Sequence, residues 1–390
     1  MTLVRRNQAM LSRKEKAEYV QAVLRLKKTG VYDNYVTEHA AITYYGHGGP
    51  SFLPWHREFL RRFELALQEV DSTVTLPYWD WTVDNAVNAS IWDDVFMGGD
   101  GEPGDRKVTT GRFAGKEGNW KCLPIGGEPE YLTREFGVQI GSLPTVQDVD
   151  ECLQVMPYDS PPWDGTSSPS FRNFLEGGTG PNIHNRVHLW VGGQMLPLSS
   201  PNDPVFFLHH ANTDRLWARW QTEQRAPYEP QEGGPQGQNA GDAMIPWGGD
   251  TTIDSVLYHR DLGYMYDTEE PVAEGDRMLP GDVLYPGGSL EYRDGKLLLY
   301  TFSYTPEGAL VLADIRNSRE LWNTGPLPGT PGRLTMQPDG DLVVYDSDGT
   351  RSWSSQTAGN PGSRFYVTFR GTAAIYAPDP DRETWWEPKG

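Results

Sequence analysis

The 390-residue sequence has little of several features that would fix its class. It holds only two cysteines, Cys122 and Cys152, which excludes a disulfide-rich scaffold and a cysteine-based zinc site. No apolar run reaches the roughly 18–20 residues of a membrane span. Basic residues number 34 against 53 acidic ones, so the net charge is −19 and neither nucleic acid nor a membrane is an expected partner.

Targeting signals are also lacking. The N-terminus, MTLVRRNQAM, has two arginines but no apolar stretch behind them, so no signal peptide is visible. We therefore expect a cytoplasmic protein, with secretion alongside a partner left open. For Cys122 and Cys152, a disulfide and two free thiols are equally compatible with the sequence.

What is present begins with helical patterns in residues 1–267. SRKE at 12–15 fits a capping box, and apolar residues then recur at helical spacing until Gly30. A second helix is predicted to start after Pro54 and to run to Val70. Further helical patterns occur at 171–176, 184–191 and 209–224.

After a predicted linker at 268–280, residues 281–390 repeat one pattern three times. Each repeat consists of an alternating strand, a glycine turn, a second strand, an acidic turn and a tryptophan. The repeated positions are Gly308, Gly340 and Gly371, followed by Trp322, Trp353 and Trp385. Three such repeats predict an all-β unit with pseudo-threefold symmetry whose tryptophans share one core.

Seven of the eight histidines fall into two clusters. The first cluster is His39, His47 and His56, and the second is His184, His188, His209 and His210. Two histidines four residues apart share one helix face, whereas two adjacent ones do not, so at most one of the 209–210 pair is expected to bind with His184 and His188. Asp214 lies one turn beyond His210 and is expected to orient a ligand imidazole.

The ligand set has a chemical preference. Sites made only of imidazoles, without thiolate or an obvious carboxylate, are uncommon for catalytic zinc and for non-haem iron, and they suit copper. Two such sites facing each other could bind dioxygen between them. The sequence therefore favours a binuclear copper centre over the alternative of ordinary core or surface histidines.

Four motifs make residues 1–267 resemble the bacterial tyrosinases, which belong to the type 3 copper family with catechol oxidases and haemocyanins. The motifs are SFLPWHREFLRRFE (51–64), LPYWDW (76–81), NIHNRVHLWVGGQM (182–195) and SPNDPVFFLHHANTDRLW (200–217). The resemblance implies a bundle of four helices holding two copper ions. It implies copper A on His39, His47 and His56, and copper B on His184, His188 and His210, with His209 beside copper B as a non-ligand.

The resemblance also implies roles for neighbouring residues. Glu176 matches a glutamate that holds a water, and Asn185 matches the asparagine that helps to activate it, so that an incoming phenol is deprotonated. Phe206 matches an aromatic residue that stacks on a copper B histidine. Tyr45 stands where many relatives have a cysteine bonded to the second copper A histidine, so that crosslink is impossible here.

Residues 281–390 resemble the bulb-type mannose-binding lectins, which form a β-prism of three similar sheets. The family motif is Q-x-D-x-N-x-V-x-Y, and only the middle repeat keeps its polar groups. These are Gln337, Asp339, Asp341 and Tyr345, with aspartate at 341 in place of asparagine. The resemblance implies one altered carbohydrate site at most, and a unit that covers the copper site or helps to load it.

Together these observations predict an α-helical copper domain followed by an all-β domain. The expected activity is ortho-hydroxylation of small phenols and oxidation of o-diphenols to o-quinones, with dioxygen as co-substrate. Three alternatives are an o-aminophenol or catechol oxidase with little action on monophenols, a haemocyanin-like oxygen carrier, and a carbohydrate-binding protein with a vestigial enzyme domain.

Overall fold

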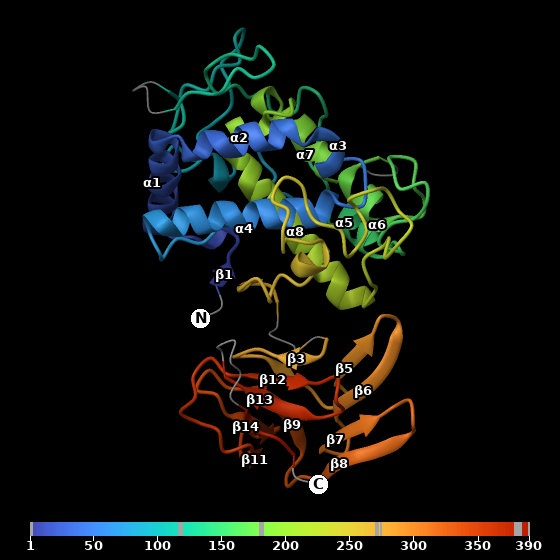
Figure 1. Cartoon of the computed structure of the whole chain (residues 1–390). Helices are drawn as coiled ribbons and strands as arrows, with labels where there is room; N and C mark the ends of the chain where they lie inside the picture. The colour runs from blue at the N-terminus through green and yellow to red at the C-terminus, as the bar shows by residue number, and fades with distance from the viewer. Residues whose placement is uncertain are drawn as a thin grey trace. The chain divides into compact units, whose positions relative to one another are not determined.

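A computed structural model of the chain describes residues 3–115, 120–178, 183–269, 273, 275–377 and 384–388. The chain divides into two compact units, the first spanning Leu3–Asp267 and the second beginning at Thr268 (Figure 1). Part of the predicted linker, 270–272 and 274, lies outside the described residues. Within the described ranges, no helix is long and apolar enough to cross a membrane.

The first unit is built from α-helices. They are α1 (Arg13–Thr29), α2 (Val31–Ala41), α3 (Thr43–Gly46), α4 (Phe52–Val70), α5 (Val146–Leu153), α6 (Phe171–Glu176), α7 (His184–Val191) and α8 (Val205–Gln224). The capping box that opens α1 is confirmed, because the Ser12 hydroxyl accepts from the Glu15 N–H and the Glu15 carboxylate accepts from the Ser12 N–H. Gly30 ends α1 in the left-handed conformation, with φ of 82°.

Two helices differ from the sequence prediction. Helix α2, which carries His39, was missed, since its valine, tyrosine, threonine and asparagine residues have modest helix propensity. Helix α4 begins at Phe52 instead of after Pro54, which therefore stands in the first turn. A proline there costs no hydrogen bond, because the first N–H groups of a helix have no partner within it.

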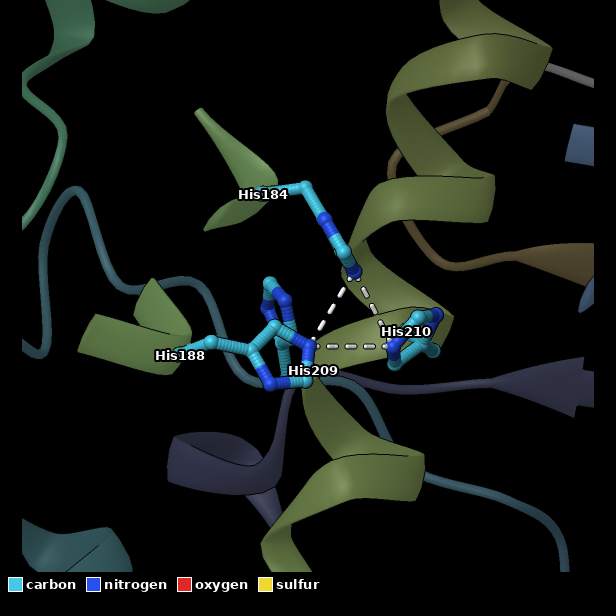
Figure 2. Close-up of side chains that lie close together, drawn as sticks. All are labelled: His184, His188, His209 and His210. Atoms are coloured by element: carbon cyan, nitrogen blue, oxygen red, sulfur yellow. Dashed lines mark hydrogen bonds between the residues drawn. The ribbon is translucent and has the colours of Figure 1, made fainter. Parts of the chain in front are cut away.

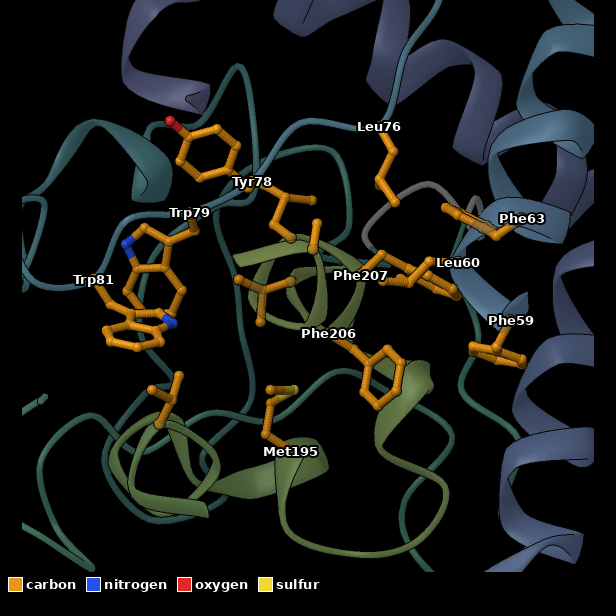
Figure 3. Packing of buried hydrophobic residues seen from close by; sticks show 14 of the residues in the cluster. Phe59, Leu60, Phe63, Leu76, Tyr78, Trp79, Trp81, Met195, Phe206 and Phe207 are labelled. Carbon is orange, nitrogen blue, oxygen red and sulfur yellow. The ribbon is translucent and has the colours of Figure 1, made fainter. Parts of the chain in front are cut away.

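The core of the first unit lies between α4 and α8, which pack against each other (Figure 1). The rings of Phe63 and Phe207 stack with centroids 3.6 Å apart, and Phe59 lies nearly parallel to Phe207 (Figure 3). Strand β1 (Leu3–Arg5) pairs in parallel with β2 (Tyr264–Tyr266), which brings the two ends of the unit together. Cys122 and Cys152 are free thiols, both buried.

The second unit consists of three four-stranded antiparallel sheets. Their orders are β5-β6-β7-β8, β11-β10-β9-β4 and β14-β13-β12-β3. The strands are β3 (Arg277–Met278), β4 (Val283–Leu284), β5 (Ser289–Asp294), β6 (Leu297–Tyr304), β7 (Ala309–Asp314), β8 (Arg319–Pro326), β9 (Pro331–Met336), β10 (Leu342–Asp346), β11 (Arg351–Ser354), β12 (Arg364–Val367), β13 (Ala373–Tyr376) and β14 (Thr384–Trp386). Alternate residues of all three sheets meet in one apolar core.

Three tryptophans of the second unit meet in its core. Trp322 and Trp353 both pack edge-on against Trp386, at 5.9 Å and 5.7 Å between ring centroids. The side chain of Trp385, the predicted third member, lies outside the described residues. The register between β13 and β14 shifts at Ile375–Tyr376, which marks a bulge or irregularity in this strand pair.

Candidate metal centre

Four helices and one loop bring the clustered histidines together. Helix α2 carries His39 and α4 carries His56, while His47 follows α3 in an extended conformation. Helix α7 begins at His184 and also carries His188, and α8 carries the adjacent pair at 209 and 210. The spacing of four residues on α7 turns both imidazoles to one side, as predicted.

Two groups of ring nitrogens result, each with all members within 4.8 Å of one another. They are His39, His47 and His56 in the first group, and His184, His188, His209 and His210 in the second. In the first, the Nε2 atoms of His39 and His56 lie 3.4 Å apart. In the second, the Nε2 atoms of His184, His188 and His210 form a triangle with sides of 3.1, 3.1 and 3.3 Å (Figure 2).

The other ring nitrogen fixes the tautomer of most of these imidazoles. Three of them donate Nδ1–H to a backbone carbonyl: His39 to Leu198 at 2.6 Å, His56 to Phe52 at 2.8 Å and His188 to Met195 at 2.6 Å. A carbonyl oxygen only accepts, so the single proton of each neutral ring sits on Nδ1. In the same way His184 Nδ1 faces the Asn185 side-chain oxygen at 2.9 Å.

These rings are neutral. Burial lowers the pKa of each imidazole, to about 4 for His188 and well below the usual value for His39, His56, His184 and His210. At His39, His56, His184 and His188 the proton sits on Nδ1, so the converging Nε2 atoms present lone pairs, which repel unless a cation lies between them. Nitrogens that each bind one ion at about 2.0 Å lie roughly 3.1–3.4 Å apart, so the observed spacing fits a metal bound by imidazoles alone.

His209 lies against the second group without joining the Nε2 triangle. Its ring stacks on that of His184, with centroids 4.9 Å apart and planes inclined by 21°. The buried Trp81 indole donates Nε1–H to His209 Nδ1 at 3.2 Å. Trp81 was not singled out from the sequence as a site residue, although it lies in the quoted LPYWDW motif.

Two phenylalanines pack against both groups from different directions. Phe206 stacks on His210 at 4.0 Å and meets His39 edge-on at 4.8 Å. Phe52 meets His56 and His184 edge-on, each at 4.9 Å between centroids. Both phenylalanines are fully buried, so the walls around the nitrogens exclude water.

The predicted role of Asp214 is wrong. Its carboxylate accepts from Arg57 Nε at 2.6 Å and from the hydroxyls of Tyr264 and Tyr266, each at 2.6 Å. His210 Nδ1, the nearest ligand imidazole along α8, is buried without a hydrogen-bond partner among the described residues. Asp214 therefore does not orient this imidazole, and it belongs instead to an ion-pair network that links α8 to α4.

Glu176 and Asn185 both lie beside the histidines, but no hydrogen bond joins them directly among the described residues. Glu176 Oε1 accepts from the N–H of Gly48, next to His47, at 2.6 Å. Its Oε2 accepts from Arg172 at 3.1 Å, an i,i+4 pair on α6 that the sequence pattern could have indicated. Burial raises the pKa of Glu176, although Arg172 acts in the opposite direction.

Comparisons with known proteins agree over the helical unit. A family model described as the common central domain of tyrosinase matches residues 29–223. A tyrosinase of Streptomyces antibioticus is 47% identical over 265 residues, which cover 66% of this chain and 96% of that protein. Grixazone synthase of Streptomyces griseus is 45% identical over 260 residues, 57% and 85% of the two chains. The structure of a polyphenol oxidase from Thermothelomyces thermophila superposes with a TM-score of 0.53 at 25% identity, covering 68% of this chain and 88% of the other.

Proposed function

The chain belongs to the tyrosinase family, and from this premise we propose which residues carry its activity. The enzyme ortho-hydroxylates monophenols and oxidises o-diphenols to o-quinones with dioxygen, using two copper ions. We assign one copper to His39, His47 and His56, and the other to His184, His188 and His210.

The observation that carries this assignment is the convergence of Nε2 lone pairs. The Nε2 atoms of His39 and His56 lie 3.4 Å apart, and those of His184, His188 and His210 lie 3.1–3.3 Å apart. His47 offers a ring nitrogen within 4.8 Å of those of His39 and His56. When bound there, a copper pair supplies redox chemistry that activates dioxygen. His209 remains a non-ligand in this assignment. Its Nδ1 accepts the Trp81 N–H, so the proton of the neutral ring sits on Nε2, and the ring stacks on that of His184.

The surrounding side chains have proposed roles in binding and proton transfer. The Glu176 carboxylate, beside the loop that holds His47, takes the phenol proton at an Oε atom, because the phenolate is the form that reacts. Asn185 holds His184 through its side-chain oxygen. Phe206 holds the ring of His210 by stacking and keeps water away from it.

Copper content and substrate range test this proposal. We expect two coppers per chain after reconstitution, and oxygen uptake with a monophenol, a catechol and an o-aminophenol assayed side by side. Oxygen uptake with the catechol and the o-aminophenol but not with the monophenol would show an oxidase with little action on monophenols. Reversible oxygen binding without turnover would show a carrier, and fewer than two coppers would overturn the ligand assignment.

For the second unit we propose a lectin-like β-prism with one altered carbohydrate site. Gln337 donates to the Tyr345 hydroxyl at 2.7 Å, and Asp339 is exposed nearby along the chain, which supports a site on the middle repeat. Asp341 is buried and bonded to Arg351 and neighbouring serines, so the proposed site excludes it. Titration of the full chain with mannose tests this site.

Two wider expectations remain part of the proposal. Cutting the chain between Asp267 and Gly281 and comparing phenol turnover before and after tests whether the second unit limits the activity of the first. Unchanged kinetics after a clean cut would rule out such a limit. Cell fractionation of the native host tests the expected cytoplasmic location.

A further inference from the structure

One short turn, Met195–Leu198, accepts a hydrogen bond from one histidine of each group. His188, on α7, donates Nδ1–H to the carbonyl of Met195 at 2.6 Å. His39, on α2, donates Nδ1–H to the carbonyl of Leu198 at 2.6 Å. The two donors are 149 residues apart in sequence, but their acceptors are only three residues apart.

The other fixed imidazoles are held differently. His56 donates to the carbonyl of Phe52, which precedes it by one turn on α4. His184 faces the side chain of its neighbour, Asn185. Each of these contacts is local to one helix and orients a ring of one group, whereas the turn at 195–198 contacts rings of both groups.

The turn is anchored at both ends. The Met195 side chain is fully buried, and its N–H donates to the Gly192 carbonyl at 3.0 Å. At the other end the N–H of Ser200 donates to the Pro197 carbonyl at 2.9 Å, and the buried Ser199 hydroxyl donates to Glu128 at 3.1 Å. These contacts hold the backbone on either side of the two acceptor carbonyls.

The middle of the turn is stiff and faces outward. Pro197 fixes its own φ, which limits the conformations open to the segment between the acceptors. The side chains of Leu196 and Leu198 are 43% and 42% exposed, so they contribute little packing to hold the turn. Its shape therefore depends on the proline and on the two anchored ends.

We propose that Met195–Leu198 is a positioning element that sets the orientation of one imidazole at each copper. It acts through His39 and His188 and need not touch the substrate. A loosened turn lets both rings move, so it lowers the copper affinity of both sites. Loss of a contact local to one helix lowers the affinity of one site only. The inference rests on the copper ligands assigned under the proposed function.

The test compares three variants of the full chain. Pro197→Gly loosens the turn, Asn185→Ala removes the local partner of His184, and Pro103→Gly makes the same backbone change in an exposed turn away from the histidines. Each variant is loaded with Cu²⁺ and equilibrated against a graded chelator, and bound copper per chain is measured. Melting of the metal-free protein reports the fold, since a proline-to-glycine change acts on the unfolded chain at both positions.

We expect Pro197→Gly to weaken both coppers by about 10–100-fold, the usual effect of losing the partner of a metal-binding imidazole. Asn185→Ala is expected to lower the affinity for one copper, and Pro103→Gly is expected to leave both affinities unchanged. Pro197→Ala, which keeps a restricted backbone, is expected to recover part of the affinity at both sites. If Pro197→Gly does not fold, Ser199→Ala serves instead, because it removes only the side-chain contact with Glu128. This variant is also expected to bind both copper ions more weakly.

Two results would overturn the inference. A folded Pro197→Gly chain that binds both coppers as the unchanged chain does, or that loses affinity at one site alone, shows that the turn does not serve both. An unchanged chain that binds fewer than two coppers overturns the proposed function, and the inference falls with it. The first outcome leaves the ligand assignment standing, so the two failures are distinguishable.

Discussion

The imidazole rings of His56 and His210 stack on each other, with centroids 4.4 Å apart and planes inclined by 16°. They come from α4 and α8, the two helices at the centre of the helical unit, and they belong to different histidine groups. The two histidine groups are therefore in direct contact through these rings. A change in the spacing of α4 and α8 moves one ligand of each proposed copper.

Removing one of the stacked rings tests the two-site assignment. His210→Ala deletes one corner of the Nε2 triangle, so we expect the chain to bind one copper in place of two. Phenol oxidation should fall by at least about 100-fold, since loss of even an indirect metal partner costs 10–100-fold. Copper per chain and oxygen uptake measure both effects. Two tightly bound coppers in the variant would contradict the assignment.

Behind the stacked rings, a buried ion-pair network ties the same two helices together. Arg57 follows His56 on α4, and its Nε donates to Asp214 on α8 at 2.6 Å. Arg5, from β1, donates to Glu64 at 2.7 Å and lies 3.4 Å from Asp214. Breaking a buried pair by removing one partner leaves the other charge uncompensated, which costs about 3–5 kcal/mol.

Asp214→Asn is therefore expected to lower the free energy of unfolding by about that amount, measured by urea unfolding of the metal-free chain. Glu223→Gln is the control, because Glu223 lies on the same helix in an exposed pair with Arg219. A surface change of this kind should stay within about 0.5 kcal/mol. Equal effects of the two substitutions would show that the buried network does not hold α4 against α8.

The Asp214 carboxylate also makes the free energy of unfolding depend on pH in acid. Burial alone would raise the pKa of Asp214, but Arg57 and Arg5 outweigh it, so the pKa lies below its usual value. A carboxylate whose pKa is lower in the folded than in the unfolded chain stabilises the fold at any pH above the unfolded-state pKa. This stabilisation is lost as the pH falls through the folded-state pKa. We expect the stability difference between the unchanged chain and Asp214→Asn to shrink below about pH 4. A difference that grows in acid would contradict this sign.

Some of this architecture could be predicted because local signals carried it. The capping box at Ser12–Glu15 and the stop at Gly30 gave the bounds of α1, and the spacing of His184 and His188 gave a shared helix face. The three tryptophan repeats predicted an all-β unit, and the structure has three four-stranded sheets there; the register irregularity between β13 and β14 has no sequence signal.

Other features depend on tertiary contacts that sequence spacing does not encode. The carbonyls of Met195 and Leu198 are present whatever the side chain, so nothing in the sequence marked them as partners of imidazoles. Asp214 was assigned to an imidazole because it lies one turn from His210, but Arg57 and two tyrosines from distant segments take its oxygens. A buried charge pairs with the nearest opposite charge in space, which sequence distance does not reveal.

The proposed proton acceptor is tested by Glu176→Gln. The amide oxygen can still accept from the Gly48 N–H, but the side chain can no longer take up a proton. We expect turnover of a monophenol to fall by about 100–10,000-fold, the usual contribution of general base catalysis, and turnover of a catechol by less than about tenfold. Initial rates of oxygen uptake with the two substrates measure the ratio. Glu151→Gln, an exposed glutamate on α5, is the control, and an equal loss on both substrates would contradict a role specific to the phenol proton.

In the middle repeat of the second unit, two substitutions can separate effects on mannose binding from effects on the stability of the unit. Asp341 is 1% exposed and accepts from Arg351 at 2.8 Å and from the hydroxyls of Ser354 and Ser355. Asp341→Asn restores the lectin motif residue but loses the charged acceptor, so we expect the second unit to lose about 1–3 kcal/mol of stability without gaining affinity for mannose. Calorimetric melting and mannose titration of the full chain measure the two effects.

Gln337→Ala gives the opposite pattern, because Gln337 is half-buried and its side chain hydrogen-bonds only to the Tyr345 hydroxyl among the described residues. Any mannose binding by the full chain should be lost in this variant, while the melting temperature of the second unit changes little. Asp348→Asn, an exposed turn residue, is the control for both measurements. If Asp341→Asn instead creates or strengthens mannose binding, its side chain reaches the sugar and the proposed site must include it. Binding that survives Gln337→Ala would place the carbohydrate elsewhere on the unit.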